Sequence, residues 1–106
     1  MRYISTRSKN YTATASEAIL AGIAPDGGLF VPESFPQIDF SIWSRNSYQQ
    51  IAEKLFSLFL SDFPPAAIQR VTDKSYADNF DSPQITPVHW LDEDTGVICG
   101  LSKLSA

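Results

Sequence analysis

Two adjacent glycines beside an aspartate form the first pattern that could do chemistry. Residues 25–28 read Pro-Asp-Gly-Gly, and an apolar run that ends at Pro32 follows them. Glycines let backbone amides approach an anion, so Asp26, Gly27 and Gly28 could cradle a phosphate. Asp26 would repel that phosphate unless its side chain caps the turn. We favour a tight turn, because the glycine spacing fits neither a Walker loop nor a dinucleotide fingerprint.

Nucleophilic or metal chemistry would depend on very few side chains. His89 is the only histidine and Cys99 the only cysteine, which leaves any zinc site short of ligands. His89 lies between Val88 and Trp90 in an expected strand, where a structural imidazole is favoured over a general base. The acidic residues 92–94 predict a solvated turn, since a calcium site requires more oxygen ligands at a defined spacing. We assign no catalytic, cofactor-binding or metal-binding residue.

Composition and charge exclude several classes of partner. The chain has 106 residues, a net charge of -4 and 43% hydrophobic residues, as expected of a globular domain. Its eight basic residues are scattered, which argues against a nucleic-acid partner. No apolar run approaches the roughly 20 residues that cross a bilayer, and no signal peptide is recognisable. A single cysteine allows no intrachain disulfide, so we expect a cytoplasmic protein without nucleic-acid or membrane partners.

Short elements must position the glycine turn. We expect a strand, a loop, a helix and a second strand at residues 1–6, 8–14, 18–21 and 29–31. Ser16 is the expected N-cap of the helix, with Glu17 in the first turn near the positive end of the helix dipole. Gly22 should end the helix, because glycine readily adopts a positive φ.

The middle of the chain predicts a helical hairpin. Ser47 is the expected N-cap of its first helix, and Glu53 and Lys54 fall on the polar side. The apolar positions of that helix share one face and are Ile51, Leu55, Leu58 and Phe59. The pair Pro64 and Pro65 suits the first turn of the second helix. A weaker apolar stripe on that helix comprises Ile68, Val71, Ser75 and Tyr76.

A strand hairpin is expected near the C-terminus. Residues 88–91 predict one strand and residues 97–101 its partner, after breakers at 81–83. Trp43, Trp90 and the phenylalanines are expected in the core and on a surface that packs against a further domain. The fold class is therefore α+β, a small domain of short strands with a helical hairpin. Such a domain should expose apolar area when alone.

Four short pieces of sequence occur in a specific order and spacing. They are Tyr-Ile-Ser-Thr-Arg at residues 3–7, the helix-turn-strand stretch at 20–32, and weaker pieces at 47–52 and 76–81. Together they resemble the N-terminal region of the threonine synthase family. The resemblance implies an α/β parent of the fold-type II pyridoxal-phosphate kind, in which this region packs against the cofactor-binding domain.

The end of the chain departs from the family pattern. In the family a strand leads into a His-Gly-Pro-Thr segment, followed closely by the lysine that forms the Schiff base. Residues 98–106 contain no such segment, and nothing around Lys103 matches the motif. We interpret Lys103 as a solvated lysine near a terminus. The resemblance therefore implies that pyridoxal phosphate belongs to the parent enzyme, with no cofactor held by this chain.

Three hypotheses for function follow. The first is that residues 1–106 are a threonine synthase-like N-terminal domain, a fragment of a larger chain, structural and inactive alone. Its partner would be the cofactor-binding domain of an enzyme that converts O-phosphohomoserine and water to L-threonine and phosphate. The second is a free-standing, non-catalytic interaction module of the same fold, with self-association through exposed apolar surface. The third is a small anion-binding domain that uses Gly27 and Gly28.

Overall fold

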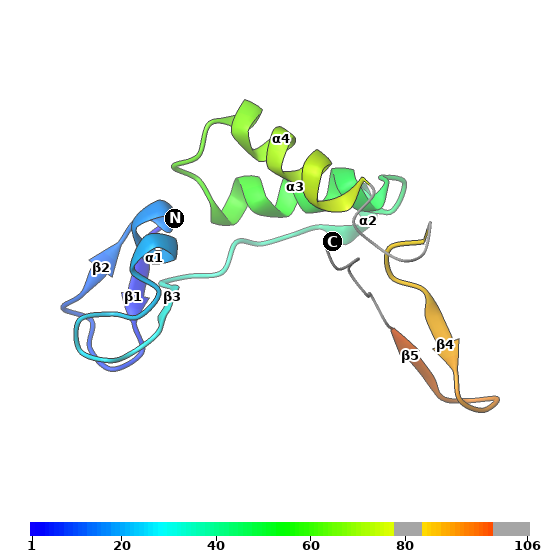
Figure 1. The fold of residues 1–106 in the computed structure, drawn as a ribbon, viewed down its shortest axis with the longest axis horizontal. Coiled ribbons are helices and arrows are strands. Elements are labelled where there is room, and N and C mark those ends of the chain that lie inside the picture. Colours follow the sequence, from blue (N-terminus) through cyan, green and yellow to red (C-terminus); the bar gives the residue numbers. More distant parts are fainter. Residues whose placement is uncertain (78–83, 99–106) are drawn as a thin grey trace, which may run out of the picture.

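The computed structural model describes residues 1–77 and 84–98, in which short strands flank a helical hairpin (Figure 1). In chain order the elements are β1 (Tyr3–Ser5), β2 (Thr12–Ala13), α1 (Ala15–Ala21), β3 (Phe30–Pro32), α2 (Phe40–Trp43), α3 (Tyr48–Phe59), α4 (Pro65–Tyr76), β4 (Val88–Trp90) and β5 (Gly96–Ile98). This mixture of short strands and helices is the α+β class that the sequence predicts.

The N-terminal strands form an antiparallel sheet in the order β2-β1-β3. Ile4 of β1 lies opposite Val31 of β3 and Thr12 of β2. The strand β2 corrects the sequence prediction, which placed residues 8–14 in a loop. A strand of two residues is too short to show an alternating pattern, and its pairing comes from backbone hydrogen bonds to β1.

The N-cap of α1 is Thr14, so the expectation of Ser16 is wrong. The Thr14 hydroxyl accepts a hydrogen bond from the Glu17 amide, and the Glu17 carboxylate accepts one from the Thr14 amide. This reciprocal capping box satisfies two amides that have no partner within the helix. Gly22 ends α1 with a φ of 71°, as predicted.

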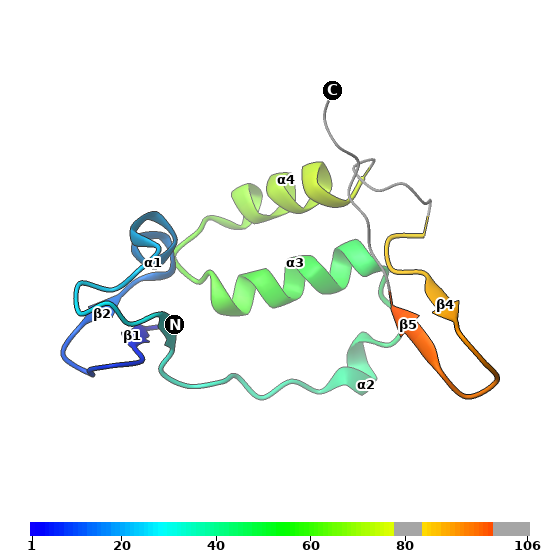
Figure 2. The ribbon, with the colours of Figure 1, turned by 60° about the horizontal axis from the view of Figure 1, so that its bottom comes forward.

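The helical hairpin is confirmed, with α3 and α4 packed side by side and antiparallel (Figures 1 and 2). Ser47 is the N-cap of α3 as predicted, and Gln50 completes a second capping box. Pro65 occupies the first turn of α4, where a missing amide hydrogen has no cost, and Pro64 is the N-cap.

The buried side of α4 differs from the predicted stripe. Ile68 is 4% exposed as expected, but Val71 is 53% exposed and Ser75 is exposed. Thr72 is the most buried side chain of the helix instead. Its hydroxyl donates to the Ile68 carbonyl one turn earlier at 2.8 Å, which satisfies the polar group without an external partner.

A short helix, α2, lies between the sheet and the helical hairpin in the chain and was not predicted. Residues 33–39 form an extended connection that leads into it (Figure 2). Asp39 caps α2 by accepting a hydrogen bond from the Ser41 amide. Trp43 is half-buried, packs edge-on against Phe40, and has the Lys54 ammonium 5.6 Å from its ring centroid.

The predicted hairpin is present as β4 and β5 and projects from the rest of the molecule (Figure 1). Residues 99–101 of the predicted second strand lie outside the described residues. Val88 pairs with Ile98, and Trp90 pairs with Gly96. All six strand residues are exposed. An isolated two-stranded hairpin is marginally stable in water, so this element has the form of one that packs on further structure.

The described fold buries little of its apolar surface. Its buried hydrophobic side chains are Ala15, Ala24, Ala52 and Ile68. Large apolar side chains of the described residues remain exposed instead, among them Leu20 at 87% and Trp90 at 69%. Among residues 1–77 and 84–98, no helix is long and apolar enough to span a membrane.

Candidate functional site

The glycine turn is tied to strand β1 by a polar network. Ser5 is 4% exposed, and its hydroxyl donates to Oδ1 of Asp26 at 2.7 Å. The Gly28 amide donates to the same oxygen at 2.9 Å. These hydrogen bonds, with that from Ser5 the larger cause, hold the pKa of Asp26 below its ordinary value. The side chain of Asp26 therefore caps the turn.

The amides of the two glycines are already engaged. The Gly27 amide donates to the Ala24 carbonyl at 2.8 Å, and the Gly28 amide donates to Asp26. An anion cradle needs amides that point free, so this turn does not fit the phosphate-binding hypothesis. Gly27 has a φ of 78°, which other residues rarely adopt. The predicted turn is correct.

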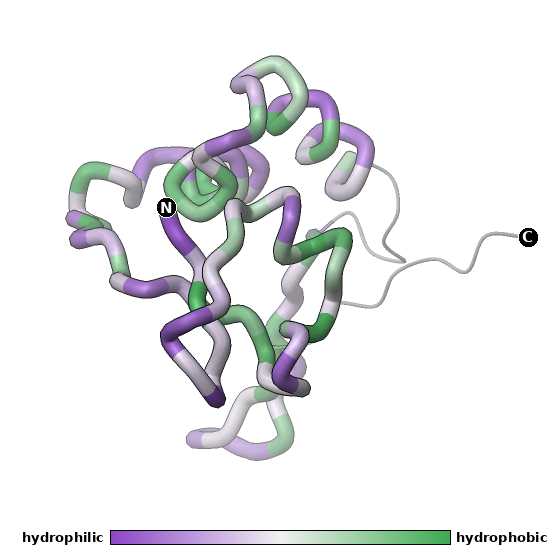
Figure 3. Tube along the Cα trace, turned by 90° about the vertical axis from the view of Figure 1, so that its left-hand side faces the viewer, coloured by the Kyte–Doolittle hydropathy of each residue, from purple (hydrophilic) through white to green (hydrophobic). Residues whose placement is uncertain are grey.

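Apolar side chains surround the turn on its solvent side. The backbones of Ile23 and Leu29 pair across it and bring the end of α1 beside the start of β3. Leu20 is 87% exposed, while Ile19, Ile23 and Leu29 are each 60% exposed. We call these four residues the α1 face. Figure 3 views the chain trace from this side and colours its apolar stretches green.

The sheet and α1 are joined to the helical hairpin by hydrogen bonds to the last residue of α3 and to the loop that follows it. The Tyr3 hydroxyl donates to the Phe59 carbonyl at 2.7 Å. The amide of Ser16 donates to Asp62 at 3.1 Å, and the Ser16 hydroxyl donates to the same carboxylate. The hydroxyl contact is the largest cause of a lowered Asp62 pKa. The contact between Ser16 and Asp62 therefore connects α1 to the helical hairpin, and we call this contact the joint.

The C-terminal hairpin carries a second exposed apolar group. Val88 at 45%, Trp90 at 69% and Ile98 at 72% exposed share one side of the hairpin, and we call these three residues the hairpin face. Val97, 45% exposed, lies on the opposite side with His89, and Leu91, 70% exposed, follows β4. Side chains of this size exposed together are typical of an interaction surface. Trp90 therefore belongs to a surface, as the sequence predicts.

The remaining candidate residues form no catalytic group in the described part of the chain. His89 is exposed on β4 and pairs through its backbone with Val97. Asp92 accepts hydrogen bonds from the amides of Asp94 and Thr95, so it caps the acidic turn. Over residues 1–77 and 84–98, no three His, Cys, Asp or Glu side chains are placed to hold a metal ion. Cys99 and Lys103 lie outside the described residues.

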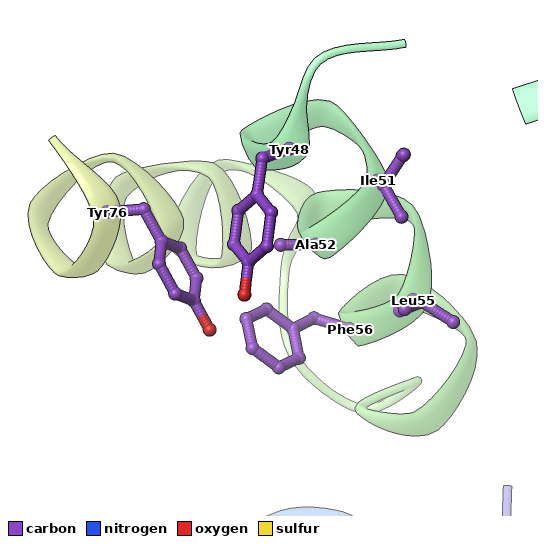
Figure 4. A pocket seen from close by; sticks show the side chains of 6 residues that line it. All are labelled: Tyr48, Ile51, Ala52, Leu55, Phe56 and Tyr76. Atoms are coloured by element: carbon purple, nitrogen blue, oxygen red, sulfur yellow. The ribbon is translucent and has the colours of Figure 1, made fainter. Parts of the chain in front are cut away.

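A small apolar hollow lies between the two long helices (Figure 4). Its volume is about 190 Å³, and Tyr48, Ala52, Phe56 and Tyr76 are among its lining residues. The rings of Tyr48 and Tyr76 meet edge to face with centroids 5.2 Å apart. No charged side chain lines it, so the hollow reflects helix packing and offers no group for acid-base chemistry.

The described residues do not fit pyridoxal phosphate. The cofactor requires an imine-forming lysine beside a phosphate cradle. The glycine turn supplies no free amides, as described above. Lys54 lies on α3, donates to Asn46 at 3.3 Å and stacks over Trp43.

Comparison with known proteins defines the class. The family model described as threonine synthase N terminus matches residues 2–76. The threonine synthase of Corynebacterium glutamicum is 38% identical over 103 residues, which cover 89% of this chain and 21% of that protein. The threonine synthase of Saccharomyces cerevisiae is 38% identical over 93 residues, covering 81% of this chain and 18% of that protein.

A solved structure shares the fold. The crystal structure of pyridoxal-phosphate-bound threonine synthase from Brucella melitensis superimposes with a TM-score of 0.81 at 30% identity. The match covers 92% of this chain and 22% of that one. The molecule is thus an N-terminal domain of the kind found in pyridoxal-phosphate enzymes. It belongs to the threonine synthase N-terminus family, and it spans about a fifth of the length of its relatives.

The hydrogen bonds that hold the candidate site together were not predicted from the sequence. Ser5 and Asp26 are 21 residues apart, and Ser16 and Asp62 are 46 residues apart. Single serines and aspartates are common, and each of these residues has a plausible local role in a turn or a cap. A lone sequence therefore carries no signal for these pairs.

Proposed function

We propose that this chain is the N-terminal docking domain of a threonine synthase. The observation that supports it best is the exposure of large apolar side chains among the described residues, with Leu20 of the α1 face 87% exposed and Trp90 of the hairpin face 69% exposed. A stable interface removes about 800 Å² from each partner, and its centre consists of apolar side chains of this kind.

The partner in this proposal is the cofactor-binding body of the same enzyme. The Brucella melitensis relative is a pyridoxal-phosphate-bound enzyme whose matching part is only 22% of its chain. We place pyridoxal phosphate and its lysine in that larger body, because the described residues do not fit the cofactor. The whole enzyme would convert O-phosphohomoserine and water to L-threonine and phosphate. The domain alone would be inactive, and residues 1–106 would act as one docking unit.

A substitution that places a charged side chain on the α1 face tests this proposal. Leu20→Asp, made in the natural protein that contains this chain, should weaken docking because the carboxylate would be buried without a partner. The matched control is Ala21→Asp, which adds the same charge to the same helix. Ala21 is exposed and lies about 150° around the helix from the midpoint between Ile19 and Leu20.

Docking is read from threonine formation and from the rate of proteolytic release of the domain. We expect Leu20→Asp to lower threonine formation and to raise the rate of proteolytic release by about five- to thirtyfold, which corresponds to a loss of about 1–2 kcal/mol of docking free energy. The control should change neither substantially. If Leu20→Asp and Ala21→Asp gave the same threonine formation and the same rate of proteolytic release, the α1 face would lie in no interface. The docking role would then be refuted.

The free-standing module is the second candidate, and the same apolar faces favour it. It requires that two copies of this chain cover each other. Sedimentation of the natural protein separates the candidates, because a self-associating module would form dimers that Leu20→Asp dissociates. Under the leading proposal, Leu20→Asp acts within one polypeptide and leaves the association state unchanged.

A further inference from the structure

A second hollow opens where α1 meets the helical hairpin. Its volume is about 250 Å³, and its walls come from three elements: Ile19 of α1, Phe56 of α3 and Ile68 and Val71 of α4. Phe63, in the loop between α3 and α4, also lines it. The joint made by Ser16 and Asp62 connects these same parts of the fold, so the walls are held at a defined spacing.

The hollow has a buried floor and an open rim. Ile68 at the floor is 4% exposed, while Ile19 and Val71 at the rim are 60% and 53% exposed. Every lining side chain is apolar. Water in such a space would find no hydrogen-bond partners, and an apolar hollow of about 150 Å³ is already large enough to hold benzene. The space therefore suits one large aliphatic or aromatic side chain.

We infer that this hollow receives a large apolar side chain from the remaining part of the threonine synthase polypeptide. The inference rests on the proposed docking function. Ile19 belongs both to the rim and to the α1 face, so one interface would cover the two without a break. The Brucella melitensis relative has about four fifths of its chain outside the matching part, which is ample to supply the occupant.

An apolar side chain bound in the hollow would explain why Val71 is exposed beside it. A valine that is 53% exposed on a helix beside an apolar hollow adds little stability to the domain alone. It would act as one wall of a pocket that closes when a partner side chain enters. Central, well-packed pockets of this kind contribute most of the free energy of an interface.

Photo-cross-linking tests the inference in the natural protein that contains this chain. Val71 is replaced by p-benzoylphenylalanine, which its exposure allows, and the irradiated protein is mapped by mass spectrometry. Gln69→p-benzoylphenylalanine is the matched control, because Gln69 is exposed on the same helix and lies about 160° around it from Val71. The same probe at Ile19 gives a second view of the rim.

We expect the probes at residues 71 and 19 to cross-link, within one polypeptide, to an apolar residue outside residues 1–106. Their yield should be severalfold higher than that from residue 69. A yield no higher than the control, or a cross-link between two copies, would overturn the inference. If Leu20→Asp releases the domain but the probes give only the control yield, the docking function stands and the occupant of the hollow is refuted. If Leu20→Asp has no effect, the docking function itself fails.

Discussion

The Ser5 hydroxyl donates a 2.7 Å hydrogen bond to Asp26, which links β1 to the glycine turn 21 residues later. The same carboxylate oxygen accepts the Gly28 amide, so one oxygen fixes both the strand and the turn. The α1 face lies on this framework, because Ile23 and Leu29 pair across the turn. These hydrogen bonds thereby hold the backbone that carries Ile23 and Leu29 of the α1 face.

The first prediction concerns the space at Gly28. A Cβ atom added there would lie 2.2 Å from Ser5 Oγ and 3.1 Å from the Arg7 amide nitrogen. We expect Gly28→Ala to lower the free energy of unfolding by about 2–3 kcal/mol through overpacking. Denaturant unfolding followed by circular dichroism measures it.

Gly22→Ala is the matched control for that variant. No atom lies within 4 Å of a Cβ at Gly22, and only its φ of 71° opposes the change. We expect a smaller loss of about 1 kcal/mol. A larger loss for Gly22→Ala than for Gly28→Ala would contradict the packing at the turn.

The second prediction is a loss of stability in acid. Hydrogen bonds lower the pKa of Asp26 and Asp62 in the folded state, chiefly from Ser5 and Ser16 respectively. Their stabilising contribution is therefore complete above the unfolded-state pKa of about 4 and is lost as pH falls through the lower folded values. Unfolding free energies measured from pH 6 downwards should fall, and Ser5→Ala should make that fall shallower. An unchanged slope in Ser5→Ala would be inconsistent with the observed network.

The third prediction concerns the joint between α1 and the helical hairpin. Ser16 donates two hydrogen bonds to Asp62, one from its amide and one from its hydroxyl. Ser16→Ala and Asp62→Ala should each destabilise the fold, and the double variant should lose less than the sum of the two. A double-mutant cycle in denaturant measures this coupling. Strict additivity would mean that the hydroxyl contact contributes nothing.

The fourth prediction separates the two sides of α4. Ile68 is 4% exposed and Val71, three residues later, is 53% exposed. Ile68→Ala should cost about 2–5 kcal/mol of unfolding free energy, because it leaves a cavity in a small core. Val71→Ala should cost under about 1 kcal/mol. Similar losses for both would show that Val71 is as buried as Ile68.

Local signals account for the parts of the fold that the sequence predicted well. Ser47 caps α3, Pro65 begins α4 and Gly22 ends α1, and each does so through the chemistry of its own side chain or backbone. The local sequence could not show that Thr14 and not Ser16 is the N-cap of α1, because serine and threonine are both favourable N-cap residues. Only the contact with Asp62 explains why Ser16 is used elsewhere.

Non-local contacts account for what the sequence did not predict. Residues 12–13 form strand β2 because their backbone pairs with β1. Thr72 is buried and Val71 is exposed because of the way in which α4 packs on α3. The interaction surface was predicted only in outline, as exposed apolar area. Its two faces and the hollow beside α1 depend on bringing distant residues together.

A product assay on the natural protein that contains this chain tests its membership of a threonine synthase most directly. The protein is purified with an antibody against residues 1–106 and incubated with O-phosphohomoserine. We expect a protein about fivefold longer than this chain, as its relatives are, which releases phosphate and L-threonine in equal amounts. A protein of 11.7 kDa, or a longer one that forms neither product when loaded with pyridoxal phosphate, would contradict that membership.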